Sequence, residues 1–209
     1  MSADSDFLAL LRAIANRDSE GVSGLVARSP GLVRLAAEVG ASRQSSTPHF
    51  LDGVRHYVYA GDTALHIAAA AHWADLARQF LDLGADLRAR NRHGAEPLHY
   101  AADGAAGLPH WDPAAQAATI SCLIEAGADP NAADRRGVAP LHRAVRTRSA
   151  AAVQALLEGG ADPMRRNRSG STPMALTASN TGRSGSGSAQ AKAQLPAIVA
   201  LLKRHGAAA

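Results

Sequence analysis

Four short segments of this chain recur at a nearly constant spacing, and the spacing constrains the fold more than any single residue does. They begin at Thr63, Glu96, Ala139 and Thr172 and read Thr-Ala-Leu-His, Glu-Pro-Leu-His, Ala-Pro-Leu-His and Thr-Pro-Met-Ala. Successive segments start 33, 43 and 33 residues apart, so the middle interval is one period plus ten inserted residues. A period of this length is typical of stacked repeats, which present an extended surface, so we look for a partner before a substrate.

Each segment has the features of a helix start. The hydroxyls of Thr63 and Thr172 suit an N-cap, and proline follows at the first helical turn in three of the four segments. Glu96 and Ala139 are poorer caps, so we expect the second and third units to begin less firmly.

A second helix is predicted before each of four glycines, Gly84, Gly127, Gly160 and Gly206. The positions four and seven residues before each glycine are always apolar, which marks one face of a helix. These positions are Ala77, Phe80, Ile120, Leu123, Val153, Leu156, Val199 and Leu202. Each glycine is expected to end its helix in the left-handed conformation. A unit of two short helices cannot bury its apolar face alone, so neighbouring units must stack.

These motifs resemble ankyrin repeats over roughly residues 5–208, most closely at residues 61–69 and 127–132. The resemblance implies an all-α solenoid of stacked helix-loop-helix units, joined by β-hairpin-like fingers at about residues 86–94, 129–137 and 162–170. Ala175 departs from the pattern because it replaces the last histidine. The Arg-rich and Ala-rich composition is similar to that of bacterial members of the family.

The chain divides into two predicted regions. Residues 1–60 read as a degenerate N-terminal capping repeat plus a long inserted finger, which we expect to return through the strand-like Tyr57-Val58-Tyr59. Residues 61–209 hold four ankyrin repeats, with insertions near residues 104–113 and 180–190. The second insertion is rich in glycine and serine, a flexible composition.

Charge is distributed unevenly along the chain. The net charge is +4, but residues 1–138 sum to −4 and residues 139–209 to +8. Of the 22 basic residues 20 are arginine, which genome composition can explain, although it does not explain where the charges lie. The uneven distribution favours an anionic partner. No apolar run is long enough for a membrane span, and we expect a cytoplasmic monomer. The single cysteine, Cys122, is expected to be a buried thiol.

The resemblance also implies where a partner binds, because family members use finger tips and the inner helix of each unit. The candidate residues are Arg88, Arg90, Arg92, His93, Tyr100, Arg135, Arg136, Arg143, Arg146, Arg165, Arg166 and Arg168. Arginine and tyrosine are residue types that carry interface energy. We therefore expect non-catalytic binding of a protein partner with an acidic surface, without a cofactor.

Two other classes of function stay open. The same arginines could bind a nucleic acid or another polyanion, but the fingers contain acids and interleave no aromatic residues for base stacking. A small-molecule or catalytic role could lie around Tyr100, Asp103, His110 and Trp111, but the sequence holds no recognisable catalytic motif. A metal site is disfavoured, because His66, His99 and His142 stand one unit apart and are better explained as helix-start residues.

Overall fold

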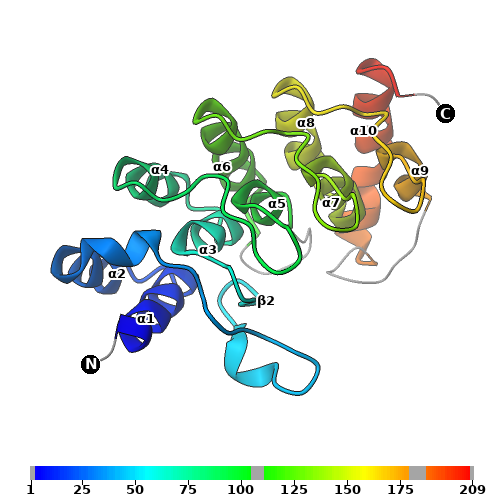
Figure 1. Cartoon of the computed structure of the whole chain (residues 1–209). Helices are drawn as coiled ribbons and strands as arrows, with labels where there is room; N and C mark the ends of the chain where they lie inside the picture. Colours follow the sequence, from blue (N-terminus) through cyan, green and yellow to red (C-terminus); the bar gives the residue numbers. More distant parts are fainter. Residues whose placement is uncertain (1–2, 105–110, 179–186, 208–209) are drawn as a thin grey trace.

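The computed structural model describes residues 3–104, 111–178 and 187–207, and within them ten α-helices form five pairs stacked in one row (Figure 1). The helices are α1 (Ala3–Ala15), α2 (Ser19–Arg28), α3 (Ala64–Ala70), α4 (Ala74–Asp82), α5 (Pro97–Ala101), α6 (Pro113–Glu125), α7 (Pro140–Thr147), α8 (Ala150–Glu158), α9 (Pro173–Thr177) and α10 (Ala189–Arg204). The all-α repeat solenoid is confirmed.

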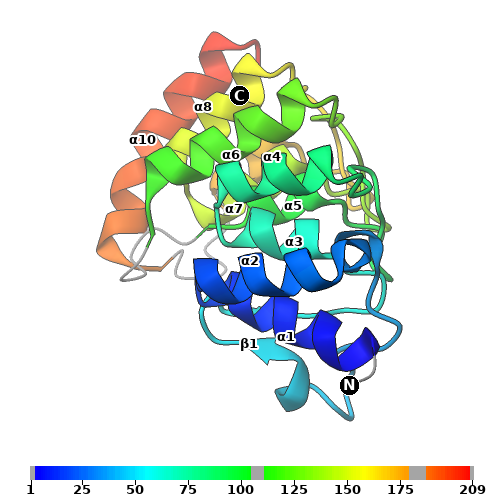
Figure 2. The ribbon, with the colours of Figure 1, turned by 90° about the vertical axis from the view of Figure 1, so that its left-hand side faces the viewer.

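The helices form two layers: the odd-numbered helices are the inner layer, and the even-numbered helices are the outer layer. From α1 to α9, each inner helix packs on the next inner helix, and from α4 to α10 each outer helix packs on the next outer one. Figure 2 shows the outer helices lying one above another. Seven of the eight apolar positions predicted from the glycines are fully buried, among them Phe80, Leu123, Leu156 and Leu202.

The first pair, α1 and α2, lies at the N-terminal end of the row. Helix α1 packs on α3. Arg17 of this pair and Arg34, which follows it, donate to carbonyl groups at helix ends of the next unit: Arg17 Nη2 to Ala71 O at 2.6 Å, and Arg34 Nε to Leu83 O at 3.1 Å. Such bonds satisfy carbonyl groups that a helix end leaves unpaired.

The histidines at the helix starts join neighbouring units, which confirms their structural role. His66 Nδ1 accepts a hydrogen bond from the backbone N–H of Thr63 at 3.1 Å, and His99 and His142 do the same for Glu96 and Ala139. On the other side of each ring, Nε2–H donates to a carbonyl of the next finger: Ala95, Val138 and Ser171 respectively. A ring that accepts at Nδ1 and donates at Nε2 is neutral.

The fingers are tight hairpin-like turns that also form a connected row. In the second finger Asp134 N donates to Val138 O at 3.0 Å and Gly137 N to Asp134 O at 2.8 Å, and the other fingers repeat this pair of bonds around Asn91 and Asn167. Glycine is required at the tips because φ is positive there, +72° at Gly137.

The insertion between the first two units contains two short 3₁₀ turns, η1 (Pro30–Arg34) and η2 (Thr47–His49), and a small hairpin of β1 (Phe50–Leu51) with β2 (His56–Tyr57). Strand β2 therefore starts one residue before the predicted strand and ends before Val58. An isolated bridge between Ala36 and Thr63 ties the insertion to the start of α3.

The last unit departs most from the prediction. Helix α10 already begins at Ala189, with Ser188 as its N-cap, so the end of the insertion predicted for residues 180–190 is helical; residues 179–186 lie outside the described part. Val199 was predicted to lie on the apolar face but is only half-buried, while Ile198, one residue earlier, and Leu202 are fully buried. The insertion near residues 104–113 similarly ends in the N-cap Asp112 and the first residue of α6.

Candidate partner-binding surface

Three arginines occupy equivalent positions on three successive fingers, and we call Arg92, Arg135 and Arg168 the arginine ladder. The backbone N–H of each donates to a carbonyl of the preceding finger or turn: Arg92 to Ala60 at 2.7 Å, Arg135 to His93 at 2.9 Å, and Arg168 to Arg136 at 3.0 Å. These bonds place one arginine per repeat along the row of fingers. All three side chains are exposed.

The side chains of the ladder arginines lie against the preceding finger or turn. A Cβ added to Gly94 would come within 3.1 Å of Arg135 Cγ, and one added to Gly137 within 3.2 Å of Arg168 Cγ. The guanidinium of Arg92 lies 5.1 Å from the ring centre of Tyr59, a cation–π distance. The aliphatic parts of Arg135 and Arg168 are therefore packed, whereas Arg92 is held through its guanidinium group.

An aromatic cluster adjoins the first rung of this ladder. Phe50, His56, Tyr57 and Tyr59, which we call the aromatic platform, come from the β1–β2 hairpin and the chain after it. Ring centres are 4.8 Å apart for Phe50 and Tyr57, 6.4 Å for Tyr57 and Tyr59, and 4.6 Å for Tyr59 and His93 of the next finger. Tyr57 is 36% exposed, so the platform has an accessible apolar edge.

The other predicted finger arginines differ in exposure and in whether their guanidinium groups already have a partner. Arg90 is neutralised by Glu96, to which its Nε and Nη2 donate at 2.9 and 2.7 Å. Arg88 reaches Gly127 O at 3.5 Å, and Arg166 Nη1 donates to Gly170 O of its own finger at 2.7 Å. Arg136 is exposed beside the ladder, whereas Arg165 is half-buried.

His93 lies beside Arg92 at the start of the row. Arg92 Nε lies 3.3 Å from His93 Nε2. Partial burial, followed by the charge of Arg92, lowers the pKa of the His93 ring, so His93 contributes ring surface at neutral pH rather than charge.

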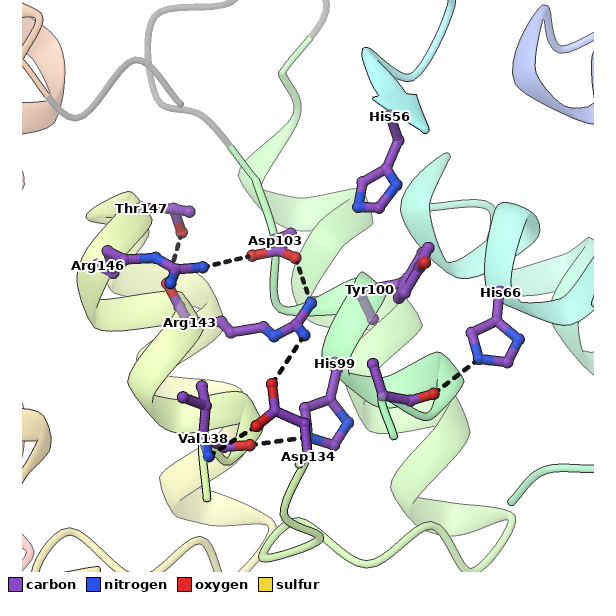
Figure 3. A network of polar contacts seen from close by, with 12 residues as sticks. His56, His66, His99, Tyr100, Asp103, Asp134, Val138, Arg143, Arg146 and Thr147 are labelled. Atoms are coloured by element: carbon purple, nitrogen blue, oxygen red, sulfur yellow. Dashed lines mark hydrogen bonds and ion pairs between the residues drawn. The ribbon is translucent and has the colours of Figure 1, made fainter. Parts of the chain in front are cut away.

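Arg143 was predicted to contact a partner, and the structure contradicts this. Its side chain is only 12% exposed and lies between two carboxylates, with Nη1 2.6 Å from Asp103 Oδ2 and Nη2 3.4 Å from Asp134 Oδ2 (Figure 3). Arg146 approaches the same Asp103 at 3.7 Å and keeps 43% of its side chain exposed. Arg143 is thus a structural bridge from α7 to the previous unit, because its charge is already paired.

Tyr100 is a second correction. It is 1% exposed and is covered by His56, whose ring centre lies 4.3 Å away. Its hydroxyl donates to the buried carboxylate of Asp62 at 2.8 Å. Tyr100, which follows the helix-start histidine His99, is therefore interior, since the N-terminal insertion folds over it.

The residues considered for catalysis are held by structural bonds. Asp103 is paired with Arg143, and Trp111 Nε1 donates to Gln116 at 3.0 Å. His110 lies outside the described residues.

Within the parts of the chain that the structure describes, no three His, Cys, Asp or Glu side chains gather as a metal ion would need, and no helix is long and apolar enough to cross a membrane. Cys122 is buried, as predicted, which raises the pKa of its thiol.

The aromatic platform is the part of this surface that sequence reasoning missed. Its members lie in an insertion outside the repeat pattern, so no register assigned them to the fingers. One signal was available: two of the three tyrosines, Tyr57 and Tyr59, alternate immediately before the first repeat in a chain with only 4% aromatic residues.

Comparison with known families agrees with this geometry. Residues 60–92 match a family model described as ankyrin repeat, and residues 123–176 match one described as ankyrin repeats in many copies. A search of curated proteins found no match. Ankyrin repeats generally mediate protein–protein interaction, and proteins built from them are typically non-catalytic scaffolds. With its helix pairs, fingers and bridging histidines, the chain belongs to the ankyrin-repeat family.

Proposed function

We propose that this protein is a non-catalytic scaffold that binds a protein partner with an acidic surface through its row of basic fingers. The observation that carries the proposal is the arginine ladder: three guanidinium groups presented in register. Among the described residues, no carboxylate lies within ion-pairing distance of Arg92, Arg135 or Arg168. Guanidinium groups presented in this way can bind carboxylates in bidentate geometry. The packed part of each arginine stem also loses less conformational entropy on binding than a fully mobile side chain would.

Nucleic-acid binding through the same surface is the second candidate. The aromatic platform beside Arg92 favours it, because bases stack on tyrosine rings. Exposed acids on the same fingers, Asp86, Asp129 and Asp162, oppose it by repelling a polyanion. A mobility-shift titration with single-stranded DNA and RNA at 20 and 150 mM salt separates the two; absence of a shift at the lower salt excludes the second candidate.

A charge-reversal pair tests the proposed function. The variant Arg135→Glu/Arg168→Glu is compared with Arg78→Glu/Lys192→Glu, which changes the net charge equally on exposed faces of α4 and α10. Affinity-tagged protein is incubated with extract of the source cells, and captured proteins are identified by mass spectrometry. We expect partners captured by the wild type to be lost with the first variant and retained with the second.

Both variants should keep the thermal midpoint of the wild type. Within the described part of the chain, the ladder arginines carry no ion pair, and the ion pair of Arg78 with Glu125 is exposed. Equal capture by the ladder variant and the control would overturn the proposed binding surface.

A further inference from the structure

The ladder and the platform together define the kind of segment that fits them. Resting on the proposed function, we infer that the partner presents a proline-rich acidic segment in the polyproline II conformation. Carboxylates at every third residue bind the arginine ladder, and proline rings at one end of the segment lie on the aromatic platform.

The spacing of the ladder carries the first step. Its arginines are repeated once per unit, and neighbouring units are separated by the packing distance of their helices, about 8–10 Å. A polyproline II helix has three residues per turn and rises about 3.1 Å per residue, so side chains at every third position share one face about 9 Å apart. A β-strand places side chains of one face about 7 or 13 Å apart, and neither spacing matches.

Pairing with the ladder depends on charge complementarity. All three ladder arginines are exposed, and none has an ion pair among the residues that the structure describes. The stems of Arg135 and Arg168 are packed. A carboxylate at each rung would complete a charge-assisted pair in bidentate geometry. A segment whose acidic residues have other spacings would pair with one ladder arginine but not with the next.

The aromatic platform carries the last step. It begins where the ladder begins, since Arg92 lies over Tyr59, and continues through Tyr57 to Phe50. Polyproline II segments dock on grooves lined by aromatic rings, and they lose little conformational entropy on binding because they are already extended. The platform therefore favours proline over other apolar residues at the end of the segment nearest Arg92.

An acidic α-helix is the strongest competing occupant, because positions seven residues apart lie about 10 Å apart on one face. A helix is some 10 Å wide and would place an entire cylinder, rather than flat rings, on the platform. The two occupants differ in the sequences that they require, so peptides distinguish them.

The test is a binding titration followed by fluorescence anisotropy in 50 mM salt. Three labelled peptides are compared: (Pro-Pro-Glu)₅, a peptide of the same composition with glutamates at irregular spacings, and an alanine-rich helical peptide with glutamate at every seventh position. We expect the first to bind at least about tenfold more tightly than the other two, because only it reaches every rung. Labelled oligo(dT) of the same length is titrated in the same way, to measure binding of a single-stranded nucleic acid.

Two variants check that binding uses both parts of the surface. Arg135→Ala and Tyr57→Ala should each weaken binding of (Pro-Pro-Glu)₅ by about fivefold or more, while the control Arg78→Ala should not. Equal affinity for the regular and irregular peptides, tighter binding of the helical peptide or oligo(dT), or no binding of (Pro-Pro-Glu)₅ would each overturn the inference. If partner capture still depends on Arg135 and Arg168 in that case, the proposed function stands without it.

Discussion

Asp62 is a fully buried carboxylate, and the groups around it replace its water shell. The backbone N–H of Tyr59, the amide of Asn91 and the hydroxyl of Tyr100 donate to it at 2.7 to 2.9 Å. The nearby His66 ring supplies no compensating charge, because burial lowers the pKa of that ring. At this scale, stability depends on a complete set of donors.

Replacing Tyr100 with phenylalanine tests this set. The variant removes one donor from a buried charge while it preserves the packing under His56. We expect the free energy of unfolding to fall by about 1.5–3 kcal/mol, as measured by urea denaturation. Tyr57→Phe, at an exposed ring, is the matched control and should change stability by less than about 0.5 kcal/mol. An equal effect of the two substitutions would show that the hydrogen bond from the Tyr100 hydroxyl to Asp62 does not stabilise the folded state.

At the scale of the element, each finger is positioned by the close approach of the next. Gly137 and Gly170 have almost the same left-handed conformation, with φ of +72° and +79°. Their surroundings differ. A Cβ at Gly137 would lie 2.8 Å from the backbone N of Arg168, whereas one at Gly170 would meet no atom of the described residues within 4 Å.

Alanine substitutions at these two glycines separate conformational strain from contact. Gly170→Ala should cost about 1–2 kcal/mol of stability, from the left-handed backbone alone. Gly137→Ala should cost more, because the methyl group also pushes the third finger away and weakens the bond from Arg168 N to Arg136 O. Denaturation curves of both variants measure the difference. Identical losses would mean that the fingers are not held by this approach.

Elements whose cause is local were predictable from the sequence. Thr63 and Thr172 cap α3 and α9, and Gly84 and Gly127 end their helices at positive φ. These features depend on a few neighbouring residues, so the repeat pattern suffices to place them. The half-burial of Val199 in α10 was not predictable in this way, because the equivalent position is fully buried in α4, α6 and α8.

At the scale of the whole molecule, the exposure of the candidate binding residues could be predicted only in part, for one reason. Exposure of the ladder arginines followed from the repeat register. The burial of Tyr100 did not, because it results from His56, which lies more than 40 residues earlier in an insertion without a repeat counterpart. Pairing of Arg143 with Asp103 and Asp134 likewise depends on how two units stack. A single unit cannot reveal contacts that form only between units.

The same stacking makes the whole array sensitive to acid. His66, His99 and His142 are buried and join four consecutive units through neutral rings. Burial lowers the pKa of all three, and that of His99 falls to about 3, with Arg143 adding to the effect. In the unfolded chain these rings take up protons near pH 6.5. The unfolded state therefore binds more protons between these values, and stability must fall as the pH drops below 6.5.

Urea denaturation at pH 7.5, 6.5, 5.5 and 5.0 measures this dependence. Below about pH 6 each buried histidine should contribute up to about 1.4 kcal/mol of lost stability per pH unit. His99→Gln removes one of them, so its stability should be lower at pH 7.5 but should decline less steeply with falling pH. His205→Gln, at an exposed ring, should keep the wild-type slope. Stability that is constant or rises from pH 6.5 to 5.0 would show that the bridging rings accept a proton without breaking the contacts between units, contrary to the geometry at Nδ1 and Nε2.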